Sequence, residues 1–261
     1  MDEVERFSIV RISEQDRREV EDVVVKESPL TIVLDDQELV TLLCTPKDLK
    51  YLAVGFLASE GIIGNKEEIR KIILDDRRGV VRVETQGDKG ATGQLLFKRV
   101  ITSGCGRGAA FYGAADATNQ ARVESQMKIS TGEVFALVRE LRHRSQLFRA
   151  TGGVHSAALC DVSGILIFSE DIGRHNAIDK IFGKCLLEDI TIDDRVVVTS
   201  GRISSEILLK IAKRNIPILI SKSAPTDMAV ELATGLGVTL IGFVRGRRMN
   251  IYTNGWRVID Q

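Results

Sequence analysis

Residues 196–242 read VVVTSGRISSEILLKIAKRNIPILISKSAPTDMAVELATGLGVTLIG, and this stretch decides the fold. Three short apolar runs recur in it at nearly equal spacing, at 196–198, 218–220 and 240–242. The segments between them, 203–214 and 226–236, have the apolar spacing of helices. Because strands that alternate with helices are typical of a parallel sheet, we expect an α/β fold in this part of the chain.

Upstream of this stretch, the sequence predicts a helix, a hairpin and a second helix. Ser130 and Glu133 have the spacing of a capping box, and apolar residues follow on one helical face as far as Phe148. Two apolar runs then flank a short turn at 162–164, which favours an antiparallel hairpin. The next helix is expected at 174–187.

The element order from residue 130 onward is that of a cytidine-deaminase-like fold. We therefore predict a three-layer α/β core with a mixed, mostly parallel sheet for residues 126–261, as an analogy of fold alone. Residues 1–125 are expected to form a smaller N-terminal α+β subdomain that ends in a Gly-rich loop around Cys105. Its strands are predicted at 29–34, 38–44, 79–86 and 94–102.

One helix is predicted in this N-terminal subdomain. Thr45 is expected to be its N-cap and Pro46 its first residue, and Gly61 is expected to end it. Residues 1–22 hold many charged side chains and almost no apolar periodicity. We expect them to form a solvated leader or edge segment.

The composition argues against several classes of protein. Lys+Arg and Asp+Glu number 36 each, so a protein that holds nucleic acid through its phosphates is not expected. The start of the chain is charged, and no window of about 18 residues is apolar throughout, so we expect neither secretion nor a membrane span. The four cysteines are far apart and form no C-x-x-C pair, which indicates a reducing, cytoplasmic setting.

Zinc deaminases carry H-x-E at one helix start and P-C-x-x-C at the next, and this chain has neither. Its first helix start contains His175, and its second contains Ser200-Gly201-Arg202. We therefore expect no zinc and no metal ligands, and only stoichiometric zinc in the purified protein would favour a zinc hydrolase. His155 and His175 can each orient a ligand, move a proton or satisfy a buried carbonyl.

Three loops follow the predicted parallel strands, at the sheet edge where α/β folds bind their ligands. They contain, in order, Ser200-Gly201-Arg202, then Ser223 and Thr226, then Phe243-Val244-Arg245-Gly246-Arg247-Arg248. Backbone N–H groups, hydroxyls and guanidinium groups bind phosphate, and an aromatic ring stacks on a flat heterocycle. We therefore predict a phosphate or nucleotide ligand, although the chain has no P-loop motif. The alternative is N-capping by the hydroxyls and an exposed basic turn.

Cys105 differs from the other cysteines in its surroundings. It lies among glycines in the segment 102–108, where an accessible thiol beside Arg107 favours the reactive thiolate. The remaining cysteines lie in apolar runs and are predicted to be buried packing residues: Cys44, Cys160 and Cys185.

Seven strings spread over roughly residues 27–252 resemble the formate dehydrogenase accessory sulfurtransferases, the FdhD family. The strings are TP at 45–46, AVGFL at 53–57, EGII at 60–63, TGGVHSA at 151–157, EDIGRHNA at 170–177, SGR at 200–202 and SAPT at 223–226. The resemblance implies a sulfur carrier in molybdenum cofactor maturation.

In that family, a loop cysteine takes sulfane sulfur from a cysteine desulfurase as a persulfide. It passes the sulfur to the Mo-bis(molybdopterin guanine dinucleotide) cofactor before the cofactor enters formate dehydrogenase. Cys105 matches the persulfide cysteine, and residues 243–248 match the cofactor-binding stretch of the family. The resemblance also implies a homodimer.

One position departs from the family pattern, which commonly has C-x-x-C in this loop. Here the second cysteine is replaced by Gly108. Either sulfur leaves Cys105 directly for the metal, which we favour, or a thiol from outside the chain assists. A paralogue with altered activity is a further interpretation, and the alternative function is a non-catalytic chaperone that binds the cofactor and hands it to an apoenzyme.

Overall fold

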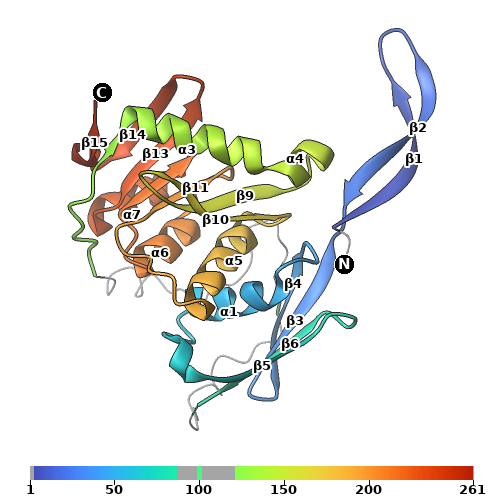
Figure 1. The fold of residues 1–261 in the computed structure, drawn as a ribbon, viewed down its shortest axis with the longest axis horizontal. Coiled ribbons are helices and arrows are strands. Elements are labelled where there is room, and N and C mark those ends of the chain that lie inside the picture. The colour runs from blue at the N-terminus through green and yellow to red at the C-terminus, as the bar shows by residue number, and fades with distance from the viewer. Residues whose placement is uncertain (1–2, 87–98, 102–120, 261) are drawn as a thin grey trace.

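The computed structural model describes residues 3–86, 99–101 and 121–260. Its C-terminal half is built on a six-stranded sheet in the order β10-β9-β11-β12-β13-β14 (Figure 1). The strands are β9 (His155–Asp161), β10 (Gly164–Asp171), β11 (Val196–Thr199), β12 (Ile218–Ser221), β13 (Thr239–Arg245) and β14 (Arg248–Thr253). The three apolar runs of the opening stretch therefore form neighbouring strands in the middle of the sheet.

The sheet is mixed, as predicted, but it is not mostly parallel. β11 pairs in parallel with β12 and β12 with β13, whereas the pairs β9–β10, β9–β11 and β13–β14 are antiparallel. The β9–β10 hairpin is confirmed. The loop predicted at 243–248 is wrong, because Gly246, with a φ of 59°, closes a hairpin between β13 and β14.

Helices cover both faces of this sheet, which confirms the three-layer arrangement. They are α3 (Thr131–Arg144) on one face, and α5 (Arg174–Leu187), α6 (Ser205–Lys213) and α7 (Asp227–Leu236) on the other. Val198 packs in the α3 core, and its neighbour Val197 packs in the opposite core. Because successive strand residues point to opposite faces, short apolar runs supply both cores. The particular likeness to cytidine deaminases stays a prediction.

Helix α3 begins where the sequence predicts, but it ends earlier than expected. The Ser130 hydroxyl accepts a hydrogen bond from Glu133 N at 3.2 Å, and the Glu133 carboxylate accepts one from Ser130 N at 2.6 Å, which completes the capping box. The Ser145 hydroxyl donates to Leu141 O at 2.6 Å, and there the chain turns into the short helix α4 (Gln146–Thr151). The prediction that Phe148 continues the buried face is therefore wrong, since Phe148 is 44% exposed.

The N-terminal half contains a five-stranded sheet in the order β5-β6-β3-β4-β7. Its strands are β3 (Ser28–Leu34), β4 (Gln37–Cys44), β5 (Ile69–Asp75), β6 (Val80–Thr85) and β7 (Arg99–Ile101), and the short helix η1 (Lys66–Glu68) precedes β5. Asp35 and Asp36, both with positive φ, form the tight turn between β3 and β4. The predicted strands at 29–34, 38–44 and 79–86 are confirmed, and only residues 99–101 of the fourth lie in the described part.

Helix α1 (Leu49–Ser59) is the helix predicted after Thr45, and Gly61 ends it in the left-handed conformation with a φ of 76°. Its start is not as predicted. The N-cap is Asp48, and its side chain makes no capping hydrogen bond. Thr45 binds Asp171 of the other half instead, so a tertiary contact replaces the expected local cap.

Helices α1 and α5 cross in direct backbone contact, with α1 between α5 and the N-terminal sheet (Figure 1). A Cβ atom on Gly55 would lie 1.7 Å from Asp179 O, and one on Gly183 would lie 1.9 Å from Tyr51 O. Only glycine fits at these two positions, so the sequence encodes the close approach of the two halves.

The segment predicted as a solvated leader is a β-hairpin of β1 (Val4–Ile12) and β2 (Arg17–Val25). It projects from the rest of the molecule (Figure 1). The expectation of a solvated leader or edge segment did not include this hairpin, which is supported by cross-strand ion pairs such as Arg6–Glu21 and Arg11–Asp22. Its exposure to solvent is confirmed.

Two short strands, β8 (Ile129–Ser130) and β15 (Val258–Ile259), pair near the C-terminus, where the short helix η3 (Gly255–Arg257) also lies. Val123 packs in the core beneath α7, and its N–H donates to Leu236 O at 2.9 Å. The predicted domain boundary at residue 125 stays a prediction. Within the described ranges, no helix has the length and apolar character needed to cross a membrane.

Candidate functional site

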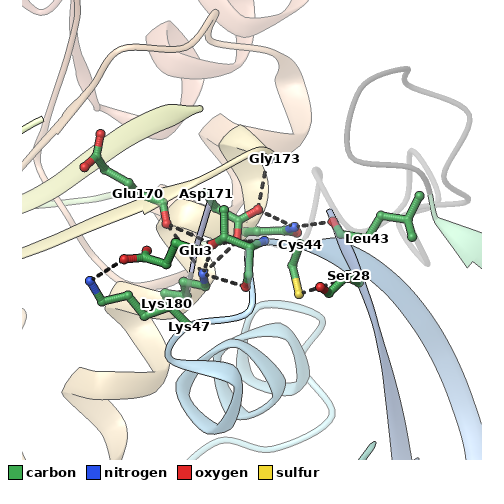
Figure 2. Close-up of polar contacts among 11 residues, drawn as sticks. Glu3, Ser28, Leu43, Cys44, Lys47, Glu170, Asp171, Gly173 and Lys180 are labelled. Atoms are coloured by element: carbon green, nitrogen blue, oxygen red, sulfur yellow. Dashed lines mark hydrogen bonds and ion pairs between the residues drawn. The ribbon is translucent and has the colours of Figure 1, made fainter. Parts of the chain in front are cut away.

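Asp171, at the end of β10, is the centre of a buried polar network (Figure 2). Its carboxylate accepts hydrogen bonds from Gly173 N and Asn176 Nδ2, both at 2.8 Å, and pairs with Lys180 Nζ at 2.7 Å. The side chains of Asp171 and Lys180 are 0% and 2% exposed. A charge can be buried here because each carboxylate oxygen has several donors.

The same network joins the two halves of the chain. The N–H and hydroxyl of Thr45 donate to Asp171 at 3.1 and 3.0 Å, and the Thr45 hydroxyl accepts a hydrogen bond from Lys180 at 2.7 Å. Asn176 donates to Leu43 O at 2.9 Å (Figure 2). The segment between β4 and α1 is therefore fixed to the first turns of α5.

A second buried network connects α1, α5 and α6. Lys210 Nζ lies 2.7 Å from Asp179, which also accepts a hydrogen bond from the Ser59 hydroxyl at 2.6 Å. Glu60 lies 3.7 Å from Lys210, and burial raises the pKa of Glu60 although that cation lowers it. The two networks hold α5 and α6 in fixed positions, and the N-termini of these helices carry the predicted site residues.

The loop after β11 lies against the start of α5. A Cβ atom on Gly201 would be 2.9 Å from Arg174 Cβ and 3.5 Å from His155 Nδ1, so this glycine allows both side chains to approach the loop. The Ser200 hydroxyl accepts a hydrogen bond from Ser156 N at 2.9 Å and lies 3.4 Å from His155 Nδ1. Ser200 is not a helix cap, because Ser204 caps α6.

The three predicted loops form one hydrogen-bonded line across the ends of the parallel strands. The Ser221 hydroxyl donates to Gly201 O at 2.7 Å and accepts from Ser223 N at 2.9 Å. Phe243 N then donates to Ser223 O at 3.0 Å. The structure thus brings together Ser200, Gly201, Ser223 and Phe243, as the sequence predicts.

Phe243 has an unusual backbone conformation, with a φ of 52°. It lies where the register of β13 and β14 shifts, between Gly242 and Arg245. The left-handed region costs a bulky residue about 1 to 2 kcal/mol, and such strain is often found at functional sites. The bulge leaves the ring half-buried, with the Arg245 guanidinium 5.5 Å from its centroid.

Other predicted residues of the third loop differ in their exposure. Val244 is 2% exposed and packs in the α3 core, so only its backbone can face a ligand. Arg247 and Arg248 are exposed at the tip of the β13–β14 hairpin. Thr226 follows the alternative interpretation, because its hydroxyl accepts from Ala229 N at 3.3 Å and caps α7.

Cationic side chains surround the Ser200 loop. Burial lowers the pKa of His155, and the nearby charges of Arg174 and Arg202 lower it further. His175 Nε2 lies 3.1 Å from Glu206 Oε2, and burial lowers the pKa of His175 although the carboxylate opposes this. His155 and His175 are therefore neutral near pH 7, beside permanently charged guanidinium groups.

The cysteines of the described ranges are buried, as predicted. Burial raises the pKa of each thiol to about 12, in the case of Cys44, Cys160 and Cys185. Cys105, Arg107 and Gly108 lie outside the described residues, so the predictions on the Gly-rich loop stay predictions.

This arrangement fits a flat ligand that carries phosphate groups. It offers an aromatic ring, hydroxyls and backbone N–H groups along one sheet edge, with guanidinium groups beside them. In the part of the chain that the structure describes, no three His, Cys, Asp or Glu side chains are placed to hold a metal ion.

Sequence reasoning missed Asp171 and Lys180 as the residues that position the site. A signal was present, because Asp171 follows shortly after a predicted strand and Lys180 lies within a predicted helix that is rich in apolar residues. Charged residues at such positions are rarely buried unless they are paired.

By fold and site, the chain is a three-layer α/β protein with hydroxyls, backbone N–H groups and guanidinium groups along the edge where its parallel strands end. The model of the FdhD/NarQ family matches residues 25–259, so the chain belongs to this family. It is similar to the sulfur carrier protein FdhD of Bacillus subtilis (strain 168), with 46% identity over 239 residues, 92% of this chain and 91% of the relative. The sulfur carrier protein FdhD of Staphylococcus aureus (strain MRSA252) is 40% identical over 252 residues, 97% of this chain and 95% of the relative.

A solved structure supports the same assignment. A protein of Desulfotalea psychrophila, provisionally described as a formate dehydrogenase accessory protein, has a TM-score of 0.79 and 27% identity. The match covers 99% of this chain and 100% of that chain. The neighbour thus shares the fold described above and is named for a formate dehydrogenase accessory role, and the two curated relatives are named as sulfur carriers.

Proposed function

We propose that Cys105 carries sulfane sulfur from a cysteine desulfurase to the Mo-bis(molybdopterin guanine dinucleotide) cofactor, before the cofactor enters formate dehydrogenase. The observation that carries this proposal is the 46% identity to a relative named sulfur carrier protein FdhD. The family resemblance implies the donor, the acceptor and the target enzyme.

The thiol chemistry of the described residues supports Cys105 as the carrier. Only a thiolate attacks sulfur efficiently. With a pKa of about 12, each of Cys44, Cys160 and Cys185 is almost entirely protonated near neutral pH, and each is buried. Cys105 is the remaining one of the four cysteines.

The loading step is a thiol–disulfide type of exchange. The Cys105 thiolate attacks the terminal sulfur of the persulfide on the desulfurase, forming a new S–S bond at Cys105. The S–S bond of the desulfurase breaks at the same time, and its cysteine leaves as a thiolate. In the second step, the terminal sulfur of the Cys105 persulfide would bond to the metal of the substrate. The S–S bond would break, and Cys105 would leave as a thiolate. The metal, in a reduced state, would supply the two electrons that convert the transferred sulfur to sulfide.

The acceptor would lie on the edge defined by Ser200, Ser223 and Phe243. The guanine ring would stack on Phe243, and its phosphates would meet backbone N–H groups and the guanidinium groups of Arg245, Arg247 or Arg248. Because the second loop cysteine is replaced by Gly108, the C-x-x-C pair that could displace the sulfur by forming a local disulfide is missing from the loop sequence. Direct transfer from Cys105 is the simplest route.

The experiment is mass spectrometry of the full chain after incubation with a cysteine desulfurase and cysteine. We expect one added sulfur atom, removable by a reducing agent, and none on the Cys105→Ala variant. Cys160→Ala is the matched control and should gain the sulfur as the wild type does. Equal gain by Cys105→Ala would contradict the proposal.

The replacement at Gly108 favours the alternative function, a chaperone that binds the cofactor without sulfur chemistry. This function predicts that Cys105→Ala still supports an active formate dehydrogenase in a strain that lacks the wild-type chain. The sulfur-carrier function predicts an inactive formate dehydrogenase in that strain.

A further inference from the structure

The β1–β2 hairpin is a sheet of its own, and the outer edge of β1 is open. The hairpin projects from the rest of the molecule (Figure 1), and within residues 3–86, 99–101 and 121–260 no further strand pairs with it. A two-stranded hairpin is at best marginally stable in water, whereas three or more strands with an apolar face form a stable sheet. The hairpin therefore lacks the additional strands that such a sheet needs.

The base of the hairpin is fixed to the rest of the chain. Lys47 forms an ion pair with Glu3 at 3.1 Å, and a Cβ atom on Gly153 would lie 2.7 Å from Val25 Cγ1. Beyond this base, residues 5–8 and 10–12 of β1 are exposed. The outer edge of β1 is thus held in a defined position and is accessible to another chain.

β1 has the features of a strand that can accept another strand. It is nine residues long, contains no proline and pairs with β2 without a bulge. Prolines and bulges are two of the devices that keep a sheet edge from pairing. By register, Phe7 and Ile9 share one face of the hairpin with Val20 and Val24, and Phe7 and Val24 are 50% and 43% exposed. A strand added to β1 would extend this apolar face.

The sequence of β1, VERFSIVRI, is complementary to itself in the antiparallel direction. When Ser8 of one copy lies opposite Ser8 of a second copy, all nine residues of β1 pair. The pairs, each formed twice, are Val4 with Ile12, Glu5 with Arg11, Arg6 with Val10, and Phe7 with Ile9. Apolar pairs and pairs of opposite charge each stabilise neighbouring strands by roughly 0.2 to 1 kcal/mol. Glu5 and Arg11 already pair with Lys26 and Asp22 of their own hairpin, so a second copy would extend these exposed ion pairs into a network.

The other edge of the hairpin, β2, does not have this property. An antiparallel pairing of two β2 strands would be centred near the middle of the strand, on Val20, Glu21 or Asp22. These three registers place Glu19 opposite Glu21, Glu21 opposite Glu21, and Asp22 opposite Asp22, respectively. Because like charges directly opposite each other are destabilising, the pattern favours β1 as the edge that pairs.

We propose that β1 is the surface through which two copies of this chain associate, with the two β1 strands antiparallel about Ser8. The two hairpins then form one four-stranded sheet in the order β2-β1-β1-β2, in which each Phe7 lies next to Ile9 of the other copy. This inference concerns a part of the molecule that the sulfur-carrier function does not use, and it stands independently of that function.

The first experiment is disulfide cross-linking of full-length Ser8→Cys under mild oxidation, with Cys105→Ala also present. Opposite residues of antiparallel strands have Cα atoms about 4.5 to 5.5 Å apart, a separation that a disulfide can span. We expect a covalent dimer joined at position 8, identified by peptide mass spectrometry. Glu21→Cys is the matched control, because Glu21 lies opposite Ser8 in the hairpin but on β2. Two β2 strands would be three strand spacings apart, about 14 Å, so this variant should not cross-link.

The second experiment is multi-angle light scattering of the full chain over a range of concentrations, which should give twice the mass of one chain. Phe7→Arg should raise the dissociation constant of the dimer about tenfold or more, because both Phe7–Ile9 pairs are lost. The introduced side chain still faces Asp22 in its own hairpin. Val24→Arg is the matched control, since it lies on the same face and faces Glu5 but is on β2, away from the second copy. It should leave the dissociation constant unchanged.

Three outcomes would overturn the pairing of β1 strands. They are the mass of a single chain at every concentration, a dimer that Phe7→Arg leaves as stable as the wild type, and equal cross-linking of Ser8→Cys and Glu21→Cys. A dimer without cross-linking at position 8 would likewise place the contact between copies on another surface and contradict the proposal.

Discussion

At the residue scale, the buried charge of Asp171 is what the site depends on most. It accepts hydrogen bonds from both halves of the chain and neutralises Lys180, which has almost no contact with solvent. Breaking such a pair costs more than the pair contributes, because the remaining charge stays buried.

We expect Asp171→Asn to lower the free energy of unfolding by about 3 kcal/mol or more, since it leaves Lys180 without a counter-charge. The measurement is urea unfolding of the purified full chain. Glu140→Gln is the control, because its exposed ion pair with Arg144 is worth less than about 1 kcal/mol. Equal effects of the two substitutions would show that Lys180 finds another partner or water.

A second residue-scale prediction concerns His155 and acid. Its pKa in the folded protein lies below the usual value of 6.5, mainly because it is buried. Below pH 6.5 the unfolded chain therefore binds a proton more readily than the folded chain, and stability falls as the pH falls through this window. His155→Gln should reduce this slope, by at most about 1.4 kcal/mol per pH unit.

The measurement for His155 is the urea midpoint of the wild type and the variant between pH 7 and pH 5. His143→Gln is the matched control, because His143 is exposed on α3 and lacks the burial that causes the effect. Parallel pH profiles for the wild type and His155→Gln would contradict the prediction.

At the scale of elements, the crossing of α1 and α5 fixes the two halves of the molecule. We expect Gly55→Ala to destabilise the protein by more than about 3 kcal/mol, because its new methyl group would lie 1.7 Å from Asp179 O and force the helices apart. Gly235→Ala, in α7, is the matched control, since nothing lies within 4 Å of the position. It should stabilise the protein by about 0.5 to 1 kcal/mol.

Thermal or urea unfolding of the two variants checks this prediction. If Gly55→Ala gives too little soluble protein for unfolding experiments, the variant and the wild type can be compared in cell lysate by limited proteolysis. A Gly55 variant as stable as Gly235→Ala would mean that the two helices can separate at no cost.

The sequence predicts elements well where local signals and tertiary contacts agree. The capping box at Ser130 and the helix at 174–187 are both found as predicted, because periodicity and packing favour the same structure there. Thr45 is different, since the hydroxyl that looks like a local cap binds Asp171, which is 126 residues away in the chain. Such a contact leaves no mark on the neighbouring sequence.

The candidate site follows the same rule. Ser200, Ser223 and Phe243 could be placed together because parallel strands end at one edge of a sheet. The hairpin closed by Gly246 could not be predicted, because its charged residues look like a loop in the sequence. Val244 is predicted as a binding residue of the third loop, but it lies in a strand, and strand alternation turns its side chain into the core.

At the scale of the whole molecule, buried charges connect the two halves of the chain. Asp171 and Lys180 have hydrogen-bond partners on the β4–α1 segment. Asp179 accepts a hydrogen bond from Ser59 at the end of α1, and Lys210 forms an ion pair with Glu60, which follows that helix. If the N-terminal half unfolded alone, these charges would lose partners while still buried in the other half, at a cost of several kcal/mol. The two halves therefore depend on each other.

We expect the halves to unfold in one cooperative transition, and two cysteines provide matched probes. Cys44 on β4 and Cys160 on β9 are both 0% exposed, and burial raises the pKa of each thiol to about 12, so neither reacts until its own half opens. The Cys105→Ala variant is given a brief pulse of alkylating agent at increasing urea concentrations, and labelling is read by peptide mass spectrometry. Both cysteines should be labelled with the same urea midpoint. Labelling of Cys44 at lower urea than Cys160 would show that the N-terminal sheet opens by itself and that the buried networks do not couple the halves.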